Sequence, residues 1–347
     1  MIQFKIKRML QFLGDTVMNK LPGNKFYFLI LFLLSIFVLL CAPFIGMELI
    51  NPATLFSAEI NTHIFFSIRL PRVIIGFFAG SGLALCGMVF QALFRNPLAT
   101  PFTLGIASGA SFGAALMILC GCTGVLLGIP TNSFGAFLGA TTAMLLVYGF
   151  SSLQRTVSNL TLLLAGIAVS FLFSSLLMFA QFLSSLRHSF QIIRWLMGGL
   201  EVYGYRDIIA MVPLVIAGVI VIILKIPELD ILVTGEDLAR TRGVNVARTK
   251  TVLFFATSVT VSAIVAICGP IGFIGMMSPH ICRLLFGNRH KIFGPATFLF
   301  GGIFLVVCDT IARVVIAPAE MPVGVITSLL GGPFFLWVLF TRILKEH

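Results

Sequence analysis

Long apolar stretches alternate with short polar breaks along almost the whole chain. Each stretch is long enough to cross about 30 Å of hydrocarbon as a helix. The breaks at GIPTN and GPIG are the shortest. This pattern predicts an all-α polytopic membrane protein with about ten transmembrane helices. The predicted spans cover roughly residues 26–46, 72–93, 104–127, 134–153, 160–184, 207–225, 250–268, 271–287, 292–314 and 323–341.

The composition agrees with a membrane location. The chain has 347 residues, 59% of them hydrophobic, whereas soluble domains are nearer 45–50% apolar. Residues 1–17 lack a clean apolar core and a small-residue cleavage site, so we expect the first span to be retained. We therefore expect a cytoplasmic segment at 1–25, a transmembrane domain at 26–341 and a cytoplasmic tail at 342–347.

The net charge of +11 is explained by membrane topology. An even number of spans places both termini on one side. With the termini in the cytoplasm, seventeen Lys and Arg residues fall in inner segments and six in outer ones, as the positive-inside rule requires. The basic excess therefore orients the spans, and a nucleic-acid partner is not expected.

Glycines recur at helical spacing within several spans. Without a hydrophobic force between helices in lipid, such small residues let helix backbones approach closely. The spacing predicts tight helix packing and no chemistry. The GxxxG pairs are Gly76 with Gly80, Gly105 with Gly109, Gly109 with Gly113, and Gly135 with Gly139.

Ionisable residues inside the spans are scarce. Asp309 is the one carboxylate deep in an apolar stretch, and Arg313 follows it by four residues, so an internal ion pair is expected. A carboxylate relay is missing, which disfavours an ion-coupled secondary transporter. No His, Glu and Asp cluster gathers at one depth, which disfavours a membrane enzyme. No GxxxxGK[ST] motif occurs, so energy from ATP would need a separate subunit.

The stretch GEDLARTRGVNVARTK, residues 235–250, is unusual because six of its sixteen residues are charged. Thr234 with Asp237 resembles a capping box, and Glu236 with Arg240 is a favourable i,i+4 pair. Gly243 can end a helix in a left-handed turn. The pattern predicts a short cytoplasmic helix of about eight residues, which is either a docking surface or a solvated loop. Arg248 and Lys250 are interpreted as the inner anchor of the next span.

Several blocks of the chain resemble the FecCD-type permeases of ABC importers for iron–siderophore complexes, haem and cobalamin. The resemblance runs from about residue 60 to the C-terminus. It implies a type II ABC importer permease and transport without covalent chemistry, with ferric siderophore favoured as substrate and haem or cobalamin as alternatives. The similar blocks are GEDLARTRGV, RLPR at 69–72, GLALCGMVFQALFRNPLATPFTLGIASGA, LLLAGIA, GPIGFIGMMSPHICRLLFG and MPVGVITSLLGGPFFLWVL.

The resemblance also implies partners and site residues. ATP and Mg would bind a separate ATP-binding subunit, and this chain would carry no cofactor. That subunit would contact the coupling segment 234–244 in the cytoplasm. The residues implied for ATPase coupling are Glu236, Leu238, Ala239, Arg240 and Gly243.

A periplasmic or lipid-anchored binding protein would dock on outward-facing arginines, since Arg offers a bidentate fork to carboxylates. The implied residues are Arg69, Arg72 and Arg313. The alternative for Arg313 is its pair with Asp309, and for Arg69 and Arg72 it is interfacial anchoring.

Asn96 and Leu98 are the implied cytoplasmic gate. The gate's second half would fall at Ser158, Asn159 and Leu160, which depart from the family pattern. A second permease copy or a homologue would complete the translocation path in the lipid of the bacterial cytoplasmic membrane.

Overall fold

The protein is helical almost throughout. Its computed structural model describes residues 24–46, 50–51, 55, 59–122, 124–126, 129–152, 159–287, 289–316 and 318–346. In chain order the elements are α2 (Asn24–Cys41), η1 (Ala42–Phe44), α3 (Glu59–Ile64), the π-helical turn η3 (Phe65–Arg69), α4 (Leu70–Phe94), η4 (Pro101–Leu104), α5 (Ile106–Leu119), β1 (Val125–Leu126), β2 (Ile129–Pro130), α6 (Thr131–Ser152), α7 (Asn159–Leu183), α8 (Leu186–Leu196), α9 (Arg206–Leu224), α10 (Ile226–Thr234), α11 (Glu236–Thr241), α12 (Val246–Cys268), α13 (Ile274–Phe286), α14 (His290–Val314) and α15 (Val323–Glu346). Strands β1 and β2 pair antiparallel, with Val125 opposite Pro130.

All ten predicted spans coincide with helices. Within the described ranges, eight helices are long and apolar enough to cross a membrane. The helices at the third and eighth predicted spans are α5, with 14 residues, and α13, with 13 residues. Both are shorter than the roughly 20 residues that a crossing helix needs, so the number of crossings stays a prediction.

Several predicted boundaries were wrong. The span expected at 104–127 ends as a helix at Leu119, because the chain turns at Gly121, whose φ is +63°, and then forms the β1–β2 hairpin. Helix α4 continues a helix that begins at Glu59, well before residue 72. Helices α8 and α10 were not predicted. Helix α8 has the sequence LRHSFQIIRWL, in which polar and charged residues interrupt the apolar ones, so it forms no apolar run.

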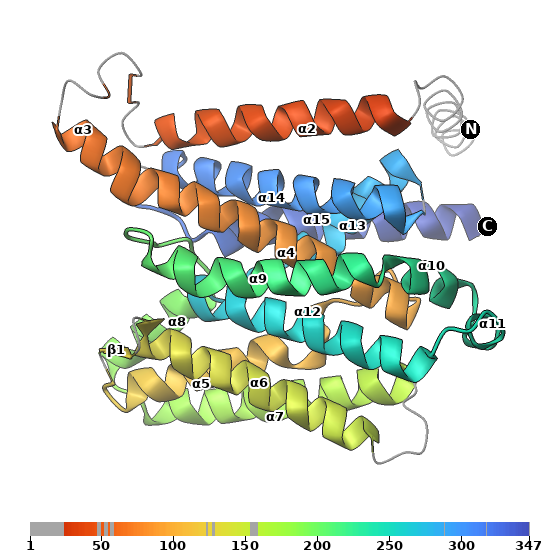
Figure 1. The fold of residues 1–347 in the computed structure, drawn as a ribbon. Helices are drawn as coiled ribbons and strands as arrows, with labels where there is room; N and C mark the ends of the chain where they lie inside the picture. Colours follow the sequence, from red (N-terminus) through yellow and green to blue (C-terminus); the bar gives the residue numbers. More distant parts are fainter. Residues whose placement is uncertain are drawn as a thin grey trace.

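The long helices run side by side between two ends of the bundle (Figure 1). At one end lie α11, the start of α2 and the last turn of α15, and we call it the α11 end. At the other end lie α3, α8 and β1, and we call it the α8 end. The first and last described helices thus begin and end near the charged segment, as an even number of crossings would require.

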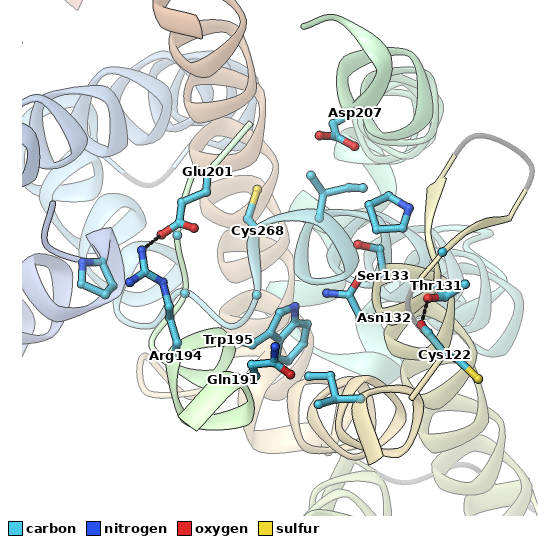
Figure 2. Close-up of a pocket in the computed structure, with 18 residues that line it drawn as sticks. Cys122, Thr131, Asn132, Ser133, Gln191, Arg194, Trp195, Glu201, Asp207 and Cys268 are labelled. Carbon is cyan, nitrogen blue, oxygen red and sulfur yellow. Dashed lines mark hydrogen bonds and ion pairs between the residues drawn. The ribbon is translucent and has the colours of Figure 1, made fainter. Parts of the chain in front are cut away.

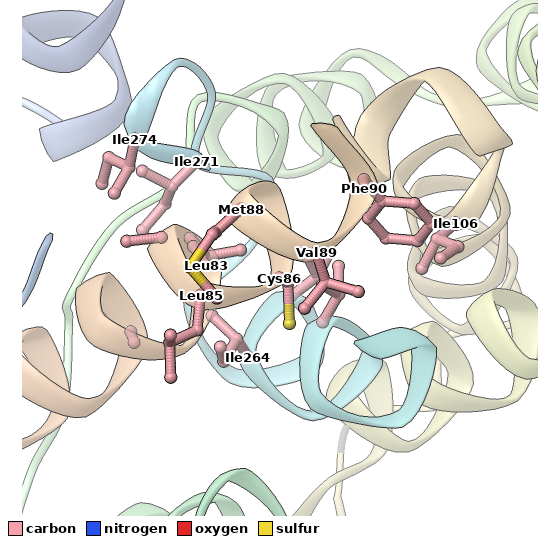
Figure 3. Packing of buried hydrophobic residues seen from close by; sticks show 14 of the residues in the cluster. Leu83, Leu85, Cys86, Met88, Val89, Phe90, Ile106, Ile264, Ile271 and Ile274 are labelled. Carbon is pink, nitrogen blue, oxygen red and sulfur yellow. The ribbon is translucent and has the colours of Figure 1, made fainter. Parts of the chain in front are cut away.

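Helix α4 is the centre of the bundle. Residues along most of its length are buried, and it packs against α14, α13, α12 and α9. Figure 3 shows its side chains, among them Met88 and Phe90, enclosed by Ile264 of α12 and Ile106 of α5. A helix this apolar on all sides is typical of a core position surrounded by other helices.

Helices α4 and α14 touch through their backbones at a pair of glycines. A Cβ atom on Gly80 would overlap the Gly301 carbonyl oxygen and lie 2.7 Å from the Leu305 Cβ. Neither contact leaves room for a side chain. The predicted close approach is therefore confirmed for Gly80, and its partner helix is α14.

Helices α5 and α6 make a second contact of this kind. A Cβ atom on Gly109 would lie 2.5 Å from the Gly139 carbonyl oxygen, and Gly113 faces Gly135 in the same way. Two of the GxxxG pairs noted in the sequence thus face each other across one interface.

We expect Gly80→Val to destabilise the protein strongly. Inserting carbon atoms into a packed interior costs about 1–3 kcal/mol, and here the obstacle is backbone that cannot rotate away. The thermal midpoint of the purified protein in detergent should fall by several degrees. Gly149→Ala in α6 is the control, because a Cβ atom there meets nothing within 4 Å. An equal midpoint for the two variants would contradict the close approach.

Candidate functional site

Helix α11 is the short helix predicted from the charged segment. It spans Glu236–Thr241, and its N-cap is Gly235, with φ of 150° and ψ of 143°. The predicted cap, Thr234, instead ends α10, and its hydroxyl donates to the Ile231 carbonyl oxygen at 2.7 Å. The capping box was thus wrong, because α10 continues to the residue before Gly235. The helix has six residues rather than the predicted eight.

The end of α11 is as predicted. Gly243 has a φ of +80°, and its amide donates to the Arg240 carbonyl oxygen at 3.0 Å. The Val244 amide donates to the Ala239 carbonyl oxygen, also at 3.0 Å. This left-handed ending satisfies carbonyl groups that the helix leaves without partners. Gly243 therefore supplies the turn that carries the chain from α11 to α12.

The residues implied for ATPase coupling divide into two groups. Leu238 is 52% exposed, and Arg240 is exposed beside it. Ala239 is fully buried and packs into the main core cluster. The predicted Glu236–Arg240 pair is replaced by an ion pair in which Lys250 Nζ lies 2.6 Å from Glu236 Oε1. Leu238 and Arg240 are thus available to a partner, whereas Ala239 is enclosed by the protein and Glu236, with a side chain 36% exposed, is bound to Lys250. The coupling roles stay predictions.

Polar contacts fasten α10 and α11 to three long helices. Arg95, which follows α4, donates from Nη2 to the Leu232 carbonyl oxygen at 3.0 Å. His290, which begins α14, pairs through Nδ1 with Asp230 Oδ1 at 2.5 Å. Lys250 of α12 holds Glu236. Helices α4, α12 and α14 therefore each contact a different point of the segment 226–241.

Helix α10 begins with a local ion pair between Lys225 and Glu228, whose Nζ and Oε1 atoms lie 2.6 Å apart. Burial raises the pKa of Glu228, but the Lys225 hydrogen bond, a backbone hydrogen bond and the Lys225 charge outweigh it. The pKa consequently lies below its ordinary value. Glu228 therefore stays ionised at neutral pH and supports the first turn of α10.

The implied gate residues lie in the loop after α4. The Asn96 Oδ1 atom accepts a hydrogen bond from the Leu98 amide at 3.0 Å, and Leu98 is 42% exposed. Ser158 and the side chains of Asn159 and Leu160 lie outside the described residues. The assignment of Asn96 and Leu98 to a gate stays a prediction.

Near the α8 end, Asp309 of α14 is shared by two arginines. Arg72 Nε and Nη2 donate to Asp309 Oδ1 at 3.0 and 2.9 Å. Arg313 Nε lies 3.2 Å from Asp309 Oδ2, which confirms the predicted i,i+4 ion pair. Arg72 Nη1 also donates to Glu320 Oε2 at 2.6 Å. One buried carboxylate thus joins α4 to α14, and Glu320 binds from the loop before α15.

The turn η1 covers the same cluster. Arg69 Nη1 donates to the Pro43 and Phe44 carbonyl oxygens at 3.3 and 3.1 Å. Arg313 Nη2 donates to the Ala42 carbonyl oxygen at 3.4 Å. Carbonyl oxygens of η1 therefore accept hydrogen bonds from Arg69 and Arg313, which lowers the cost of burying these two cations.

The arginines expected to face outward are buried in the single chain. The exposed fractions are 9% for Arg69, 6% for Arg72 and 4% for Arg313. Glu320, by contrast, has a side chain 48% exposed. Arg69 and Arg72 each bind protein groups, and their assignment to docking or to interfacial anchoring stays a prediction. Three arginines meet two carboxylates, which leaves the cluster one net positive charge.

A cavity of about 420 Å³ opens at the α8 end. Figure 2 shows it between α8, the start of α9, the end of α12 and the segment leading into α6. Arg194 and Glu201 form an ion pair at its wall, with Nη2 and Oε1 2.5 Å apart, and Asp207 extends from α9. The lining also includes Trp195, and it mixes charged, aromatic and small residues. No group of three or more metal-ligating side chains occurs among the described residues.

Sequence reasoning missed the partners of several of these residues. The sequence did not indicate that Glu320 and η1 contact the arginines, because these residues are far apart in the chain and are brought together only by folding. Lys250 was interpreted as a membrane anchor, yet it is 5% exposed and bound to Glu236. The position of Lys250 in the first turns of an apolar helix was the one feature of the sequence that could have indicated a buried, paired lysine.

The chain matches the FecCD transport family over residues 29–341. It is 40% identical over 276 residues to the cobalamin import system permease protein BtuC of Halobacterium salinarum, covering 80% of this chain and 73% of that protein. It is 36% identical to the hemin transport system permease protein HmuU of Yersinia pestis, covering 90% of this chain and 95% of that protein.

Solved structures give the same result. An inward-facing conformation of an ABC transporter assigned to the metal-chelate type superposes with a TM-score of 0.81 and 29% sequence identity. The match covers 90% of this chain and 97% of that chain. A PsaBC structure from Streptococcus pneumoniae, at 15% identity and a TM-score of 0.51, shares the fold alone.

These matches extend across nearly all the helices that carry the coupling segment, the arginine cluster and the cavity. The protein is a multi-pass permease of the cytoplasmic membrane and belongs to the FecCD transport family of ABC importer permeases.

Proposed function

We propose that this chain is the membrane subunit of an ATP-driven importer that takes up a metal chelate by alternating access. A separate subunit would bind and hydrolyse ATP, because the sequence has no P-loop motif of its own. The observation that carries the proposal is the segment α10–α11 of a FecCD-family permease, in which α11 is exposed and bound to α12 and α10 is bound to α14 and to Arg95 after α4. A partner that pushes on α11 would therefore push on the membrane domain.

The surface of α11 supports this role. Leu238 and Arg240 offer one apolar and one cationic group, beside the exposed Asp237 and Thr241 of the same helix. Interfaces are commonly anchored by a few residues, among which Arg is enriched. We infer that Leu238 and Arg240 contact the ATP-binding subunit directly, and that Ala239 and Gly243 shape the helix.

The arginine cluster supports docking of a substrate-binding protein at the α8 end. Its net positive charge suits an acidic partner, and Arg72 already binds an exposed carboxylate, that of Glu320. A carboxylate of the binding protein would compete with Glu320 for Arg72 Nη1. Docking would thus exchange one hydrogen-bonded pair for another instead of uncovering a bare arginine.

The substrate is proposed as a class. The relatives named above carry cobalamin and hemin by their names, and the solved structure is assigned to the metal-chelate type. The ferric siderophore favoured by the family resemblance stays a prediction beside cobalamin and haem. Uptake of each chelate into proteoliposomes that hold the complete complex would decide among the three.

An ion-coupled secondary transporter is the weaker candidate. Such transporters use ionisable groups at membrane depth as relays, but Asp309 is held between Arg72 and Arg313. Uptake that continues without ATP and follows a proton or sodium gradient would favour this candidate over the importer.

Arg240→Glu and Leu238→Ala should weaken binding of the ATP-binding subunit. Loss of an interface anchor costs about 2 kcal/mol or more, so the affinity should fall at least about tenfold. Co-purification and titration in detergent measure this. Arg187→Glu is the matched control, because Arg187 is an exposed arginine on α8 at the opposite end. Unchanged binding of both α11 variants would exclude α11 as the docking surface.

Glu320→Gln should strengthen docking of the substrate-binding protein several-fold, since the amide competes less well for Arg72 than a carboxylate does. The dissociation constant can be measured with the complex in lipid nanodiscs. Glu201→Gln is the control, because Glu201 is an exposed glutamate paired with Arg194 near the same end. Weaker docking by Glu320→Gln would instead show that the partner needs the Glu320 charge.

A further inference from the structure

Lys250 is a buried cation on a membrane helix. Its side chain is 6% exposed, and its Nζ donates to Glu236 Oε1 at 2.6 Å. A buried ammonium group is strongly unfavourable unless an opposite charge compensates it. The need of the buried Lys250 ammonium group for an opposite charge therefore favours the position of Glu236 against α12.

The ion pair braces the corner between α11 and α12. Glu236 is the first residue of α11, and Lys250 lies in the first turns of α12, fourteen positions later. Between them the chain turns at Gly243, and the Asn245 side chain caps α12 by accepting from the Arg248 amide at 3.0 Å. The two helices are therefore joined twice, by the turn and by the ion pair.

Helix α12 connects this corner to the cavity. It runs unbroken from Val246 to Cys268, about 34 Å at 1.5 Å per residue. At its far end Cys268 and Gly269 line the cavity, and the Cys268 carbonyl oxygen accepts from the Gly199 amide at 2.8 Å. Figure 1 shows α12 passing from the α11 end to the neighbourhood of α8.

The other two polar contacts of the segment 226–241 hold α10 and not α11. Arg95 binds the Leu232 carbonyl oxygen and His290 binds Asp230, and both of these partners belong to α10. Lys250 instead binds α11, the helix that carries the exposed Leu238 and Arg240. Lys250 therefore links that helix directly to α12.

We propose that the Lys250–Glu236 ion pair transmits movement of α11 to α12 and, through α12, to the cavity. Lys250 is a positioning residue in this proposal, and Glu236 acts inside the chain instead of contacting the ATP-binding subunit. The inference rests on the proposed function, in which that subunit docks on α11. It adds the residue pair through which docking is converted into opening and closing of the cavity.

Charge exchange tests the link. Lys250→Met, Glu236→Gln and the double variant Glu236→Lys with Lys250→Glu are compared in the complete complex, reconstituted in proteoliposomes with ATP-binding subunit and binding protein. Coupling free energies correspond to 5–150-fold effects, so we expect each single variant to raise the ATP hydrolysed per substrate imported about tenfold. The double variant should recover most of the loss. Arg248→Met, an exposed cation two residues from Lys250, should match the unmodified chain.

The outcomes separate this proposal from the proposed function. If the ATP-binding subunit does not co-purify with the unmodified chain, the proposed function fails. If it co-purifies with every variant and Lys250→Met leaves the coupling ratio unchanged, the link is refuted. A loss in Glu236→Gln that the double variant does not recover would assign Glu236 to the partner interface instead. The thermal midpoint of each variant in detergent is measured as well, because an unpaired buried charge destabilises the fold, and only a coupling loss without a fall in the midpoint supports the link.

Discussion

Helices in a bilayer gain little by burying apolar side chains against one another, since lipid is as apolar as they are, so close backbone contact has to supply the association. Here that contact lies along α4. Gly80 meets Gly301 of α14, and Gly87 meets Gly275 of α13, with no room for a Cβ atom. The positions of α12, the cavity and the arginine cluster all follow from helices that pack around α4.

At both ends of the bundle, buried charged side chains are paired with opposite charges. At the α8 end, Asp309 joins arginines from α4 and α14, and at the α11 end Glu236 neutralises Lys250. The Arg72–Asp309 pair joins α4 to α14, and the Lys250–Glu236 pair joins α12 to α11. Such groups are unfavourable when unpaired, so they resist separation of the elements that they join. Both ends are therefore suited to pass a displacement from one element to the next.

The sequence predicted features that depend on local spacing. Hydropathy located ten helices, Gly243 marked the end of α11, and the four-residue spacing gave the Asp309–Arg313 pair. Features that depend on folding could not be predicted. Arg72 and Asp309 are 237 positions apart, and no periodicity relates them. Helix α8 was missed because it has no apolar run. The Thr234 cap was wrong because no local pattern shows that α10 continues to Thr234, the residue before Gly235.

The contact between Gly80 and Gly301 has a consequence for the alternating access proposed above. Two backbones this close cannot slide along each other, because each carbonyl group lies in the space left by the other helix's missing side chain. The Arg72–Asp309 pair fixes the same two helices a second time near the α8 end. We therefore expect helices α4 and α14 to move together. A hinge motion that opens one side of the membrane and closes the other must take place at interfaces with longer side chains.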